Sequence, residues 1–252
     1  MLTFSLQSGS NGNCIYVEAA GVRLLFDAGL SGRQTRLRMA VHGRDIRDVN
    51  AVILSHRHGD HTRCAGVLHR LFKLPIYATP ATHHAIKPLV GPLNGVRLFQ
   101  PGDALTFGPV TVHTVPTPHD AAESVAFVIE AEDRRLGLFT DLGHPFDGLK
   151  QALAGVHAVY LESNYDPQML ADGWYPPEIK ARIRGEGGHL SNQEAADLLR
   201  LYVPRPQWAA LAHLSENNND PQLALQTSRR TLGADYPLTL ASRYGVSALL
   251  TV

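Results

Sequence analysis

Short apolar runs and segments of helical spacing alternate along most of the chain. Ser31 can cap a helix that runs through Met39, and helical spacing continues over Thr62–Phe72. The apolar run Ala51–Leu54 predicts a buried strand between these helices. Other runs in this part, separated by Gly- and Asn-containing turns, predict further strands at Leu2–Leu6, Cys14–Ala19, Val22–Phe26 and Pro75–Thr79.

The middle of the chain consists mainly of strand-like runs separated by Gly, Pro and Asp turns. These predict strands at Val96–Phe99, Ala104–Phe107, Val110–Val115, Val125–Glu130 and Arg135–Phe139.

Strands and helices alternate again in the last third. Ser191 followed by Glu194 is a capping-box pattern, which predicts where the helix Ser191–Tyr202 begins. Further helices are predicted at Pro176–Arg184 and Pro221–Leu232, and strands at His157–Leu161, Trp208–Ala212 and Val246–Val252. Two β-rich halves with outer helices predict an α/β fold, a four-layer αβ/βα sandwich of two mixed sheets flanked by helices.

Composition indicates one folded unit. Of the 252 residues, 44% are hydrophobic and 18% are charged, so the chain can bury a large core. No Pro/Ser/Gly-rich linker divides it, and we therefore expect residues 1–252 to form a single domain. Lys and Arg (23 together) balance Asp and Glu (23 together), which disfavours a wholly basic nucleic-acid scaffold and requires any phosphate recognition to be local.

The cysteines, the N-terminal residues and the length of the apolar segments predict where in the cell the protein acts. Its two cysteines form no CxxC pair or secreted-type framework, which fits a reducing compartment. The N-terminal residues do not resemble a secretion signal, and no apolar segment approaches the length of a membrane span. We expect a cytoplasmic protein with no membrane partner.

A cluster of imidazole and carboxylate side chains follows the apolar run that ends at Leu54. Imidazole nitrogen and carboxylate oxygen together suit zinc, manganese or iron. This loop carries more ligands than one ion with an open position takes from a single loop, so two divalent ions, zinc or manganese, are expected. The ligands of the loop are His56, His58, Asp60 and His61.

Later strand ends must complete the coordination. His119 follows the strand Val110–Val115, Asp141 follows the apolar run ending at Phe139, and His213 follows Ala212. A layered α/β domain presents its site at such strand ends. These three residues are the expected additional ligands.

Taken together, these motifs resemble the metallo-β-lactamase superfamily over nearly the full length of the chain. The ligand loop reads HxHxDH. The finer resemblance is to the WalJ/YycJ-type exonuclease branch, which is carried by SGSNGNC at Ser8–Cys14, ESNYD at Glu162–Asp166, GHLSN at Gly188–Asn192 and HLSENN at His213–Asn218.

The resemblance implies how the ligands are divided. One ion would be held by His56, His58 and His119, and the other by Asp60, His61 and His213. Asp141 would bridge them. Asp27, in the sequence FDAG, would support the ligand loop rather than bind metal, although Asp-x-Gly turns also occur without a site.

Candidates for catalysis and substrate binding are fewer. The pairing of GHLS with the later HLS also resembles transfer-RNA 3′-processing endonucleases, which implies that His189 assists the leaving group and that His213 is a ligand; the reverse assignment stays open. We count His189 and Asp60 as catalytic. Substrate contacts are expected from the turn residues Ser8, Ser10, Asn11 and Asn13 and from Arg182 and Arg184, although a plain hairpin turn and a solvated helix would have the same compositions.

We therefore expect a hydrolase, a dinuclear-metal-dependent phosphodiesterase that acts on nucleic acid. A metal-bridging hydroxide would attack the phosphodiester. The branch resemblance implies a 5′-to-3′ exonuclease, with DNA favoured over RNA. The alternative is a small-molecule hydrolase of the same fold that cleaves a cyclic phosphodiester, thioester or lactone. A metal-stabilised interaction protein without turnover is disfavoured, because Asp60 and Asp141 would be costly to bury in an empty scaffold.

Overall fold

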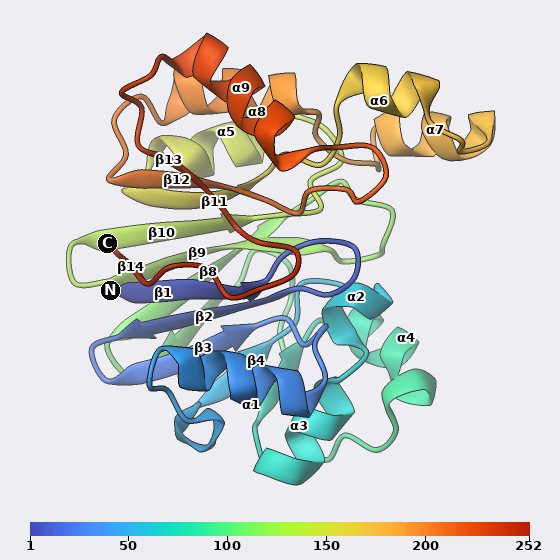
Figure 1. The fold of residues 1–252 in the computed structure, drawn as a ribbon. Coiled ribbons are helices and arrows are strands. Elements are labelled where there is room, and N and C mark those ends of the chain that lie inside the picture. The colour runs from blue at the N-terminus through green and yellow to red at the C-terminus, as the bar shows by residue number, and fades with distance from the viewer.

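Two seven-stranded sheets face one another in the computed structural model, which describes residues 1–252, and helices cover both outer sides (Figure 1). The N-terminal sheet has the order β14-β1-β2-β3-β4-β5-β6. Its strands are antiparallel from β14 to β3 and parallel from β3 to β6. They are β1 Leu2–Gln7, β2 Cys14–Ala19, β3 Val22–Phe26, β4 Ala51–Ile53, β5 Ile76–Ala78, β6 Arg97–Leu98 and β14 Leu250–Thr251.

The C-terminal sheet repeats this plan in the order β13-β12-β11-β10-β9-β8-β7. It is antiparallel from β7 to β10 and parallel from β10 to β13. Its strands are β7 Ala104–Phe107, β8 Val110–Pro116, β9 Val125–Ala131, β10 Arg134–Phe139, β11 Ala158–Glu162, β12 Trp208–Ala212 and β13 Leu238–Leu240.

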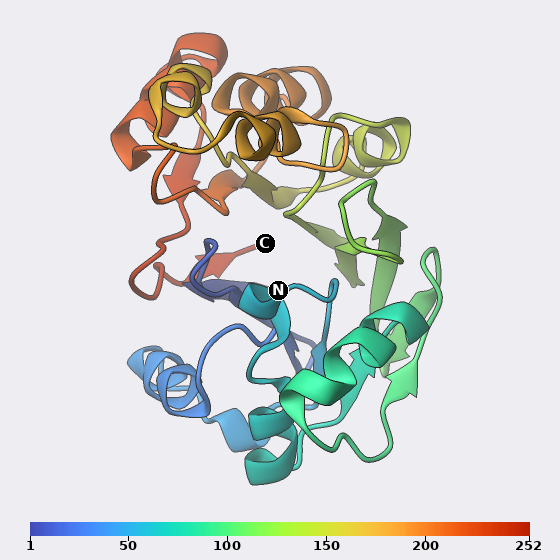
Figure 2. The same cartoon turned by 90° about the vertical axis from the view of Figure 1, so that its right-hand side faces the viewer.

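The helices form the two outer layers and one projection. Helices α1, α3 and α4 cover the N-terminal sheet, whereas α5, α8 and α9 cover the C-terminal sheet (Figures 1 and 2). None of them combines the length and the apolar character that crossing a bilayer would need. Their bounds are α1 Gly32–Val41, η1 Ile46–Asp48, α2 Gly59–Thr62, α3 Ala65–Phe72, α4 Pro80–Val90, α5 Asp147–Ala154, α6 Pro167–Asp172, α7 Pro177–Arg184, α8 Asn192–Tyr202 and α9 Pro221–Leu232.

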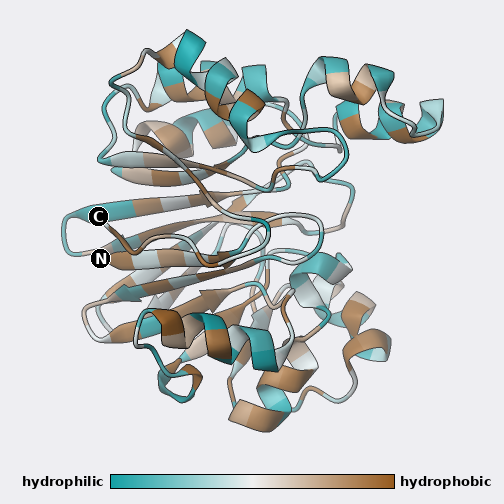
Figure 3. Cartoon of the chain, in the orientation of Figure 1, coloured by the Kyte–Doolittle hydropathy of each residue, from teal (hydrophilic) through white to brown (hydrophobic).

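Three apolar clusters hold the four layers together. The central cluster lies between the sheets, where Phe26 of β3 meets Phe127 of β9 with ring centroids 5.0 Å apart. A second cluster joins the N-terminal sheet to its helices, and a third joins the C-terminal sheet to α5, α8 and α9. Burial of these apolar surfaces is the main driving force that fixes the strand ends relative to one another. Figure 3 shows largely hydrophobic strands between helices that carry both hydrophobic and hydrophilic residues.

The predicted α/β four-layer sandwich of two mixed sheets is confirmed. Two predicted elements were too long. The helix over Thr62–Phe72 is interrupted after α2, because the carbonyls of Asp60 and His61 accept hydrogen bonds from Asn13 and Ala28 and cannot continue a helical ladder. The strand over Val246–Val252 shrinks to Leu250–Thr251, where it pairs with β1.

Helices α6 and α7 stand apart from the layers. They project from the C-terminal half beside the end of the sandwich where α2 lies (Figure 1). No residue of α7 is buried, so its position does not depend on a core of its own. The loop that follows α7 runs through His189 into the capped start of α8.

That cap provides a test of the local structure. Ser191 Oγ accepts the N–H of Glu194, and the Glu194 carboxylate accepts the N–H of Ser191, so both halves of the predicted capping box are present. Ser191→Ala removes one half and should lower the free energy of unfolding by about 1 kcal/mol. The measurement is the denaturant midpoint at an unchanged m-value. The control Glu194→Gln preserves the box, and an equal loss in both variants would contradict this account.

Candidate metal centre

The ligand loop leaves β4 and turns into the short helix α2. His58 is the N-cap residue of α2, and Asp60 and His61 lie within it, so the loop folds back toward the strand end. Gly29 makes this possible, because a Cβ at this position would lie 1.7 Å from the carbonyl oxygen of Asp60. Only glycine allows the turn after β3 to approach the loop so closely.

One group of ring nitrogens converges on the side of His58. His56 Nε2 lies 3.0 Å from His58 Nδ1, and His119 Nε2 lies 3.2 Å from the same atom. His119 comes from the loop after β8, so this group joins both sheets. The predicted residues His56, His58 and His119 are brought together.

A second group lies beside the first. His61 Nε2 is 3.3 Å from Asp60 Oδ2, and His213 Nε2, at the end of β12, is 3.5 Å from the same oxygen. The predicted set Asp60, His61 and His213 is therefore also brought together.

Asp141 lies between the two groups. Its Oδ2 is 3.1 Å from His61 Nε2, and its Oδ1 is 3.7 Å from His119 Nε2. Asp141 Oδ2 and His213 Nε2 are both buried without a hydrogen-bond partner. Buried polar atoms are normally satisfied, so two unpaired atoms at one spot indicate a missing partner.

The other nitrogen of each clustered histidine is held by a protein oxygen. His56 Nδ1 bonds Ser55 Oγ, His61 Nδ1 bonds an oxygen of Asp27 at 2.7 Å, and His119 Nδ1 bonds the carbonyl of Gly188. His213 Nδ1 bonds Glu162 Oε1 at 3.1 Å. For His58 the contact is an ion-pair distance only, with Nε2 3.2 Å from Asp120 Oδ1, an oxygen that accepts no hydrogen bond. This is the arrangement that orients metal-binding imidazoles and fixes their tautomers.

The spacing of the inward atoms fits divalent cations. Ligands at the usual Zn–N distance in a tetrahedral site are ~3.3 Å apart. The two contacts of His58 Nδ1, at 3.0 and 3.2 Å, come close to this value. The site thus has the donor types, the spacing and the outer hydrogen bonds of a divalent-metal centre.

The ionised carboxylates of the centre also favour the binding of cations. Burial raises the pKa of the Asp141 carboxyl, but His213 and His61 outweigh it and hold that pKa well below its usual range. Burial lowers the pKa of His213, but Asp141, Asp60 and Glu162 raise it to about 10. The carboxylates therefore stay ionised and attract positive charge, which divalent cations supply without protons.

Three residues that follow strand ends at the centre have a backbone φ in the left-handed region. Asp27 has φ 65°, Asp141 has φ 57° and His213 has φ 55°. Asp and His are among the residues that tolerate this conformation, and such strain concentrates at functional sites. Asp27 lies where the sequence placed it, behind the loop, accepting from Ser55 N–H with Oδ1 while Oδ2 contacts His61.

His189 lies on the wall of the centre rather than in either three-ligand group. Its Nδ1 bonds Glu162 Oε1 at 2.7 Å, and its Nε2 makes no hydrogen bond within the protein. Glu162 is fully buried and also accepts from the N–H groups of Leu142 and Leu190. Burial raises the pKa of Glu162, but His189 and the hydrogen bond with His213 outweigh it and lower that pKa to about 2.

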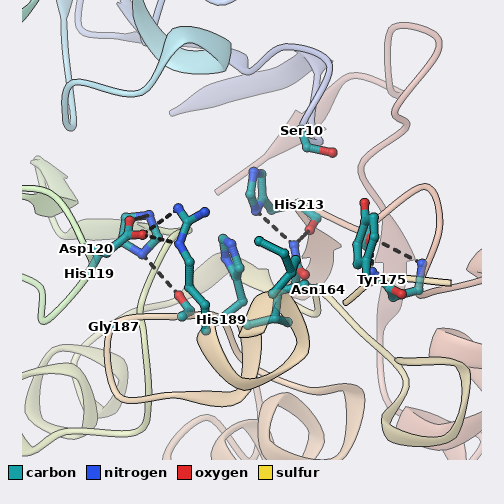
Figure 4. Close-up of a pocket in the computed structure, with 14 residues that line it drawn as sticks. Ser10, His119, Asp120, Asn164, Tyr175, Gly187, His189 and His213 are labelled. Atoms are coloured by element: carbon teal, nitrogen blue, oxygen red, sulfur yellow. Dashed lines mark hydrogen bonds and ion pairs between the residues drawn. The ribbon is translucent and has the colours of Figure 1, made fainter. Parts of the chain in front are cut away.

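The six predicted substrate contacts are distributed unevenly. Ser10 and Arg182 line a cavity beside the centre (Figure 4). Ser8 and Asn13 are buried, where Ser8 Oγ accepts from His213 N–H, and Asn13 Nδ2 lies 3.1 Å from Asp60 Oδ2 and 2.9 Å from His61 Nε2. Asn11 is exposed and donates to the carbonyl of Arg243, and Arg184 is exposed away from the cavity.

Sequence reasoning missed the contacts of Asp120 and Tyr175. Asp120 Oδ2 pairs with Arg182 Nη2 at 2.5 Å and its Oδ1 touches His58, so it connects α7 to the ligand loop. Tyr175 lines the same cavity from the segment between α6 and α7. Asp120 directly follows the predicted ligand His119, a position that could have drawn attention to it, whereas no sequence signal marked Tyr175.

Known proteins share both the fold and the sequence pattern. The family described as "Beta-lactamase superfamily domain" matches residues 22–213. Exodeoxyribonuclease YycJ of Bacillus anthracis is 38% identical over 90% of this chain and 87% of its own length. Exodeoxyribonuclease WalJ of Streptococcus pneumoniae is 32% identical over 88% of this chain and 84% of its own length.

A solved structure agrees with the fold over its whole length. Zn²⁺-bound PqqB from Methylobacterium extorquens has a TM-score of 0.76 at 19% identity, and all of each chain is covered. With the two converging ligand groups, these similarities show a metal-dependent hydrolase. The chain belongs to the β-lactamase superfamily of metal-dependent hydrolases, in the branch of the YycJ and WalJ exodeoxyribonucleases.

Proposed function

We propose that the protein is a dinuclear-metal-dependent phosphodiesterase that removes nucleotides from DNA ends in the 5′-to-3′ direction. The observation that carries this proposal is the pair of three-ligand groups on either side of Asp141, next to a histidine held by a buried carboxylate. Both relatives are named exodeoxyribonucleases, which supports DNA as the substrate and cleavage from an end. Action on DNA, which the names of these relatives imply, fits a place in the cytoplasm.

His56, His58 and His119 would hold one cation, and Asp60, His61 and His213 the other, with Asp141 shared. Such cations, zinc or manganese, lower the pKa of a water and neutralise charge on phosphoryl oxygens. Asp60 would serve catalysis as a metal ligand. Its carboxylate gives the group of Asp60, His61 and His213 a negative charge that attracts the cation.

His189 is suited to protonate the departing oxygen. Its Nδ1 is fixed on Glu162, which leaves Nε2 directed to partners outside the protein. Glu162 thereby fixes the orientation of the ring. A general acid positioned in this way contributes about 10²- to 10⁴-fold to the rate.

Three arginine side chains contact residues that line the cavity beside the centre and bring local positive charge to it. Arg57 donates to the carbonyl of Asp120, Arg182 pairs with the Asp120 carboxylate, and Arg243 donates to Ser10 Oγ. Guanidinium groups bind phosphate in bidentate geometry. Arg182 is the substrate contact we favour, because it is both exposed and next to the centre.

The first prediction concerns metal content. Fully loaded protein should hold two divalent ions per chain, and His58→Ala should hold about one, because His58 Nδ1 is the common neighbour of His56 and His119. Elemental analysis after loading and gel filtration measures this. The control His84→Ala, an exposed histidine of α4, should keep both ions. A single ion in the parent protein would contradict the dinuclear assignment.

The second prediction concerns proton donation by His189. His189→Gln should lower kcat on DNA by about 10²- to 10⁴-fold, because a deoxyribose oxygen needs a proton to depart. The kcat on a p-nitrophenyl phosphodiester should fall far less, because nitrophenolate departs without needing a proton. Both rates are measured at matched metal content. Equal losses on the two substrates would assign His189 to structure or binding instead.

The third prediction tests substrate and direction. Single-stranded and duplex DNA and RNA, labelled at either end, are incubated with metal-loaded protein. DNA should be shortened progressively from the 5′ end with release of mononucleotides, and circular DNA should resist. His58→Ala from the same preparation excludes a contaminating nuclease. Inert polynucleotides together with turnover of a thioester, a lactone or a cyclic phosphodiester would favour the small-molecule hydrolase.

A further inference from the structure

A cavity of about 250 Å³ opens directly beside the metal centre (Figure 4). His213 and His189 form its inner side, so a molecule inside it reaches both the ligand groups and the proposed proton donor. Its volume lies just below the range of about 300–1,000 Å³ typical of small-ligand sites. One nucleotide is of this size, whereas a base pair is too large.

The cavity wall is polar without being strongly charged. Away from the histidines and the Asp120–Arg182 pair, hydrogen-bonding groups come from serine and asparagine side chains, including Asn164 and Asn218. The amide nitrogen of Asn164 already donates to the carbonyl of His213, and that of Asn218 to Ser215 Oγ. The remaining hydrogen and the oxygen of each amide are the groups that can meet the edge of a base. An apolar surface is provided by Ile179 of α7 and by the ring of Tyr175.

Tyr175 is held in place on this wall. Its hydroxyl accepts a hydrogen bond of 2.9 Å from Asn217 Nδ2, in the loop that follows His213. The neighbouring Trp174 packs edge-on against it, with ring centroids 4.6 Å apart and planes at 66°. Trp174 is itself 77% exposed, which is unusual for so large an apolar side chain.

An aromatic pair of this kind beside a phosphodiesterase centre has no role in the chemistry described above. Aromatic side chains next to a nucleic-acid path offer a stacking surface for bases, and they do so without regard to sequence. The pair also lies between α6 and α7 on the projecting part of the chain, where α7 has no buried residue (Figure 1).

We propose that this cavity binds a single unpaired nucleotide next to the scissile phosphate, with its base stacked on Tyr175 and the amide side chains around its edge. Unpaired or frayed ends are then the preferred substrate, because a paired terminal base cannot enter. This inference rests on the proposed phosphodiesterase function and defines the substrate class of that site.

The test compares two diesters that share a leaving group. Thymidine p-nitrophenyl phosphate, in its 5′- and 3′-linked forms, carries a nucleoside, and methyl p-nitrophenyl phosphate does not. With metal-loaded protein, kcat/KM should be at least tenfold higher for one nucleoside form than for the methyl diester. Tyr175→Ala should remove about tenfold of that preference, the loss expected for one base stack, and Tyr175→Phe should retain it.

Tyr244→Ala is the matched control. The hydroxyl of Tyr244 also bonds the loop after His213, through Glu216, but its ring lines a separate cavity. This variant should leave the preference unchanged. An equal loss in Tyr244→Ala and Tyr175→Ala would assign the effect to the loop and overturn the nucleotide site.

Duplexes with a blunt or a frayed 5′ end extend the test to DNA. The parent protein should degrade the frayed end about tenfold faster, and Tyr175→Ala should reduce this difference. Hydrolysis of both diesters without a nucleoside preference would overturn the nucleotide site and leave the phosphodiesterase intact. No hydrolysis of either diester or of DNA would overturn the proposed function, and the inference with it.

Discussion

Two carboxylates surrounded by imidazoles, the buried Asp141 and the half-buried Asp60, constrain the architecture more than any other feature. Asp60 and Asp141 remain ionised in a region from which solvent is largely excluded, and positive charge must compensate them. Their neighbours come from both sheets, so neither sheet alone can form the centre. The apolar cluster between the sheets is what keeps the two sets of strand ends within a few ångströms of one another.

Contacts behind the clustered histidines fix the orientation of their rings. Asp27, Asp120 and Glu162 each hold the outward nitrogen of a clustered histidine. Glu162 holds His189 as well, so one carboxylate orients both a ligand and the proposed proton donor. The geometry of binding and that of proton transfer are thereby linked through a single buried side chain.

Sequence reasoning predicted most of the strands, the two-sheet plan and seven residues that the structure brings together, because each apolar run ends in a polar residue with its own chemistry. It failed where the determinants are not local. Helices α4, α5 and α6 and strand β13 were not predicted, although Thr79 and Pro80 mark the start of α4. The break after α2 depends on hydrogen bonds from Asn13 and Ala28, which are distant in the chain. The turn Ser8–Asn13 was predicted to contact substrate from its composition alone. Composition could not reveal that the side chains of Ser8 and Asn13 are buried. Nor could spacing reveal that Tyr175 faces the cavity.

The pairing of β14 with β1 places both chain ends together. The N-terminal amine of Met1 donates to the carbonyl of Val252 at 3.0 Å, at the start of β1, whereas Ser8 at the other end of that strand contacts His213. Both ends therefore emerge about one strand length from the mouth of the cavity (Figure 1). A tether, a fused domain or an immobilising surface attached at either end would leave a long polymer free to thread into the mouth from the opposite direction.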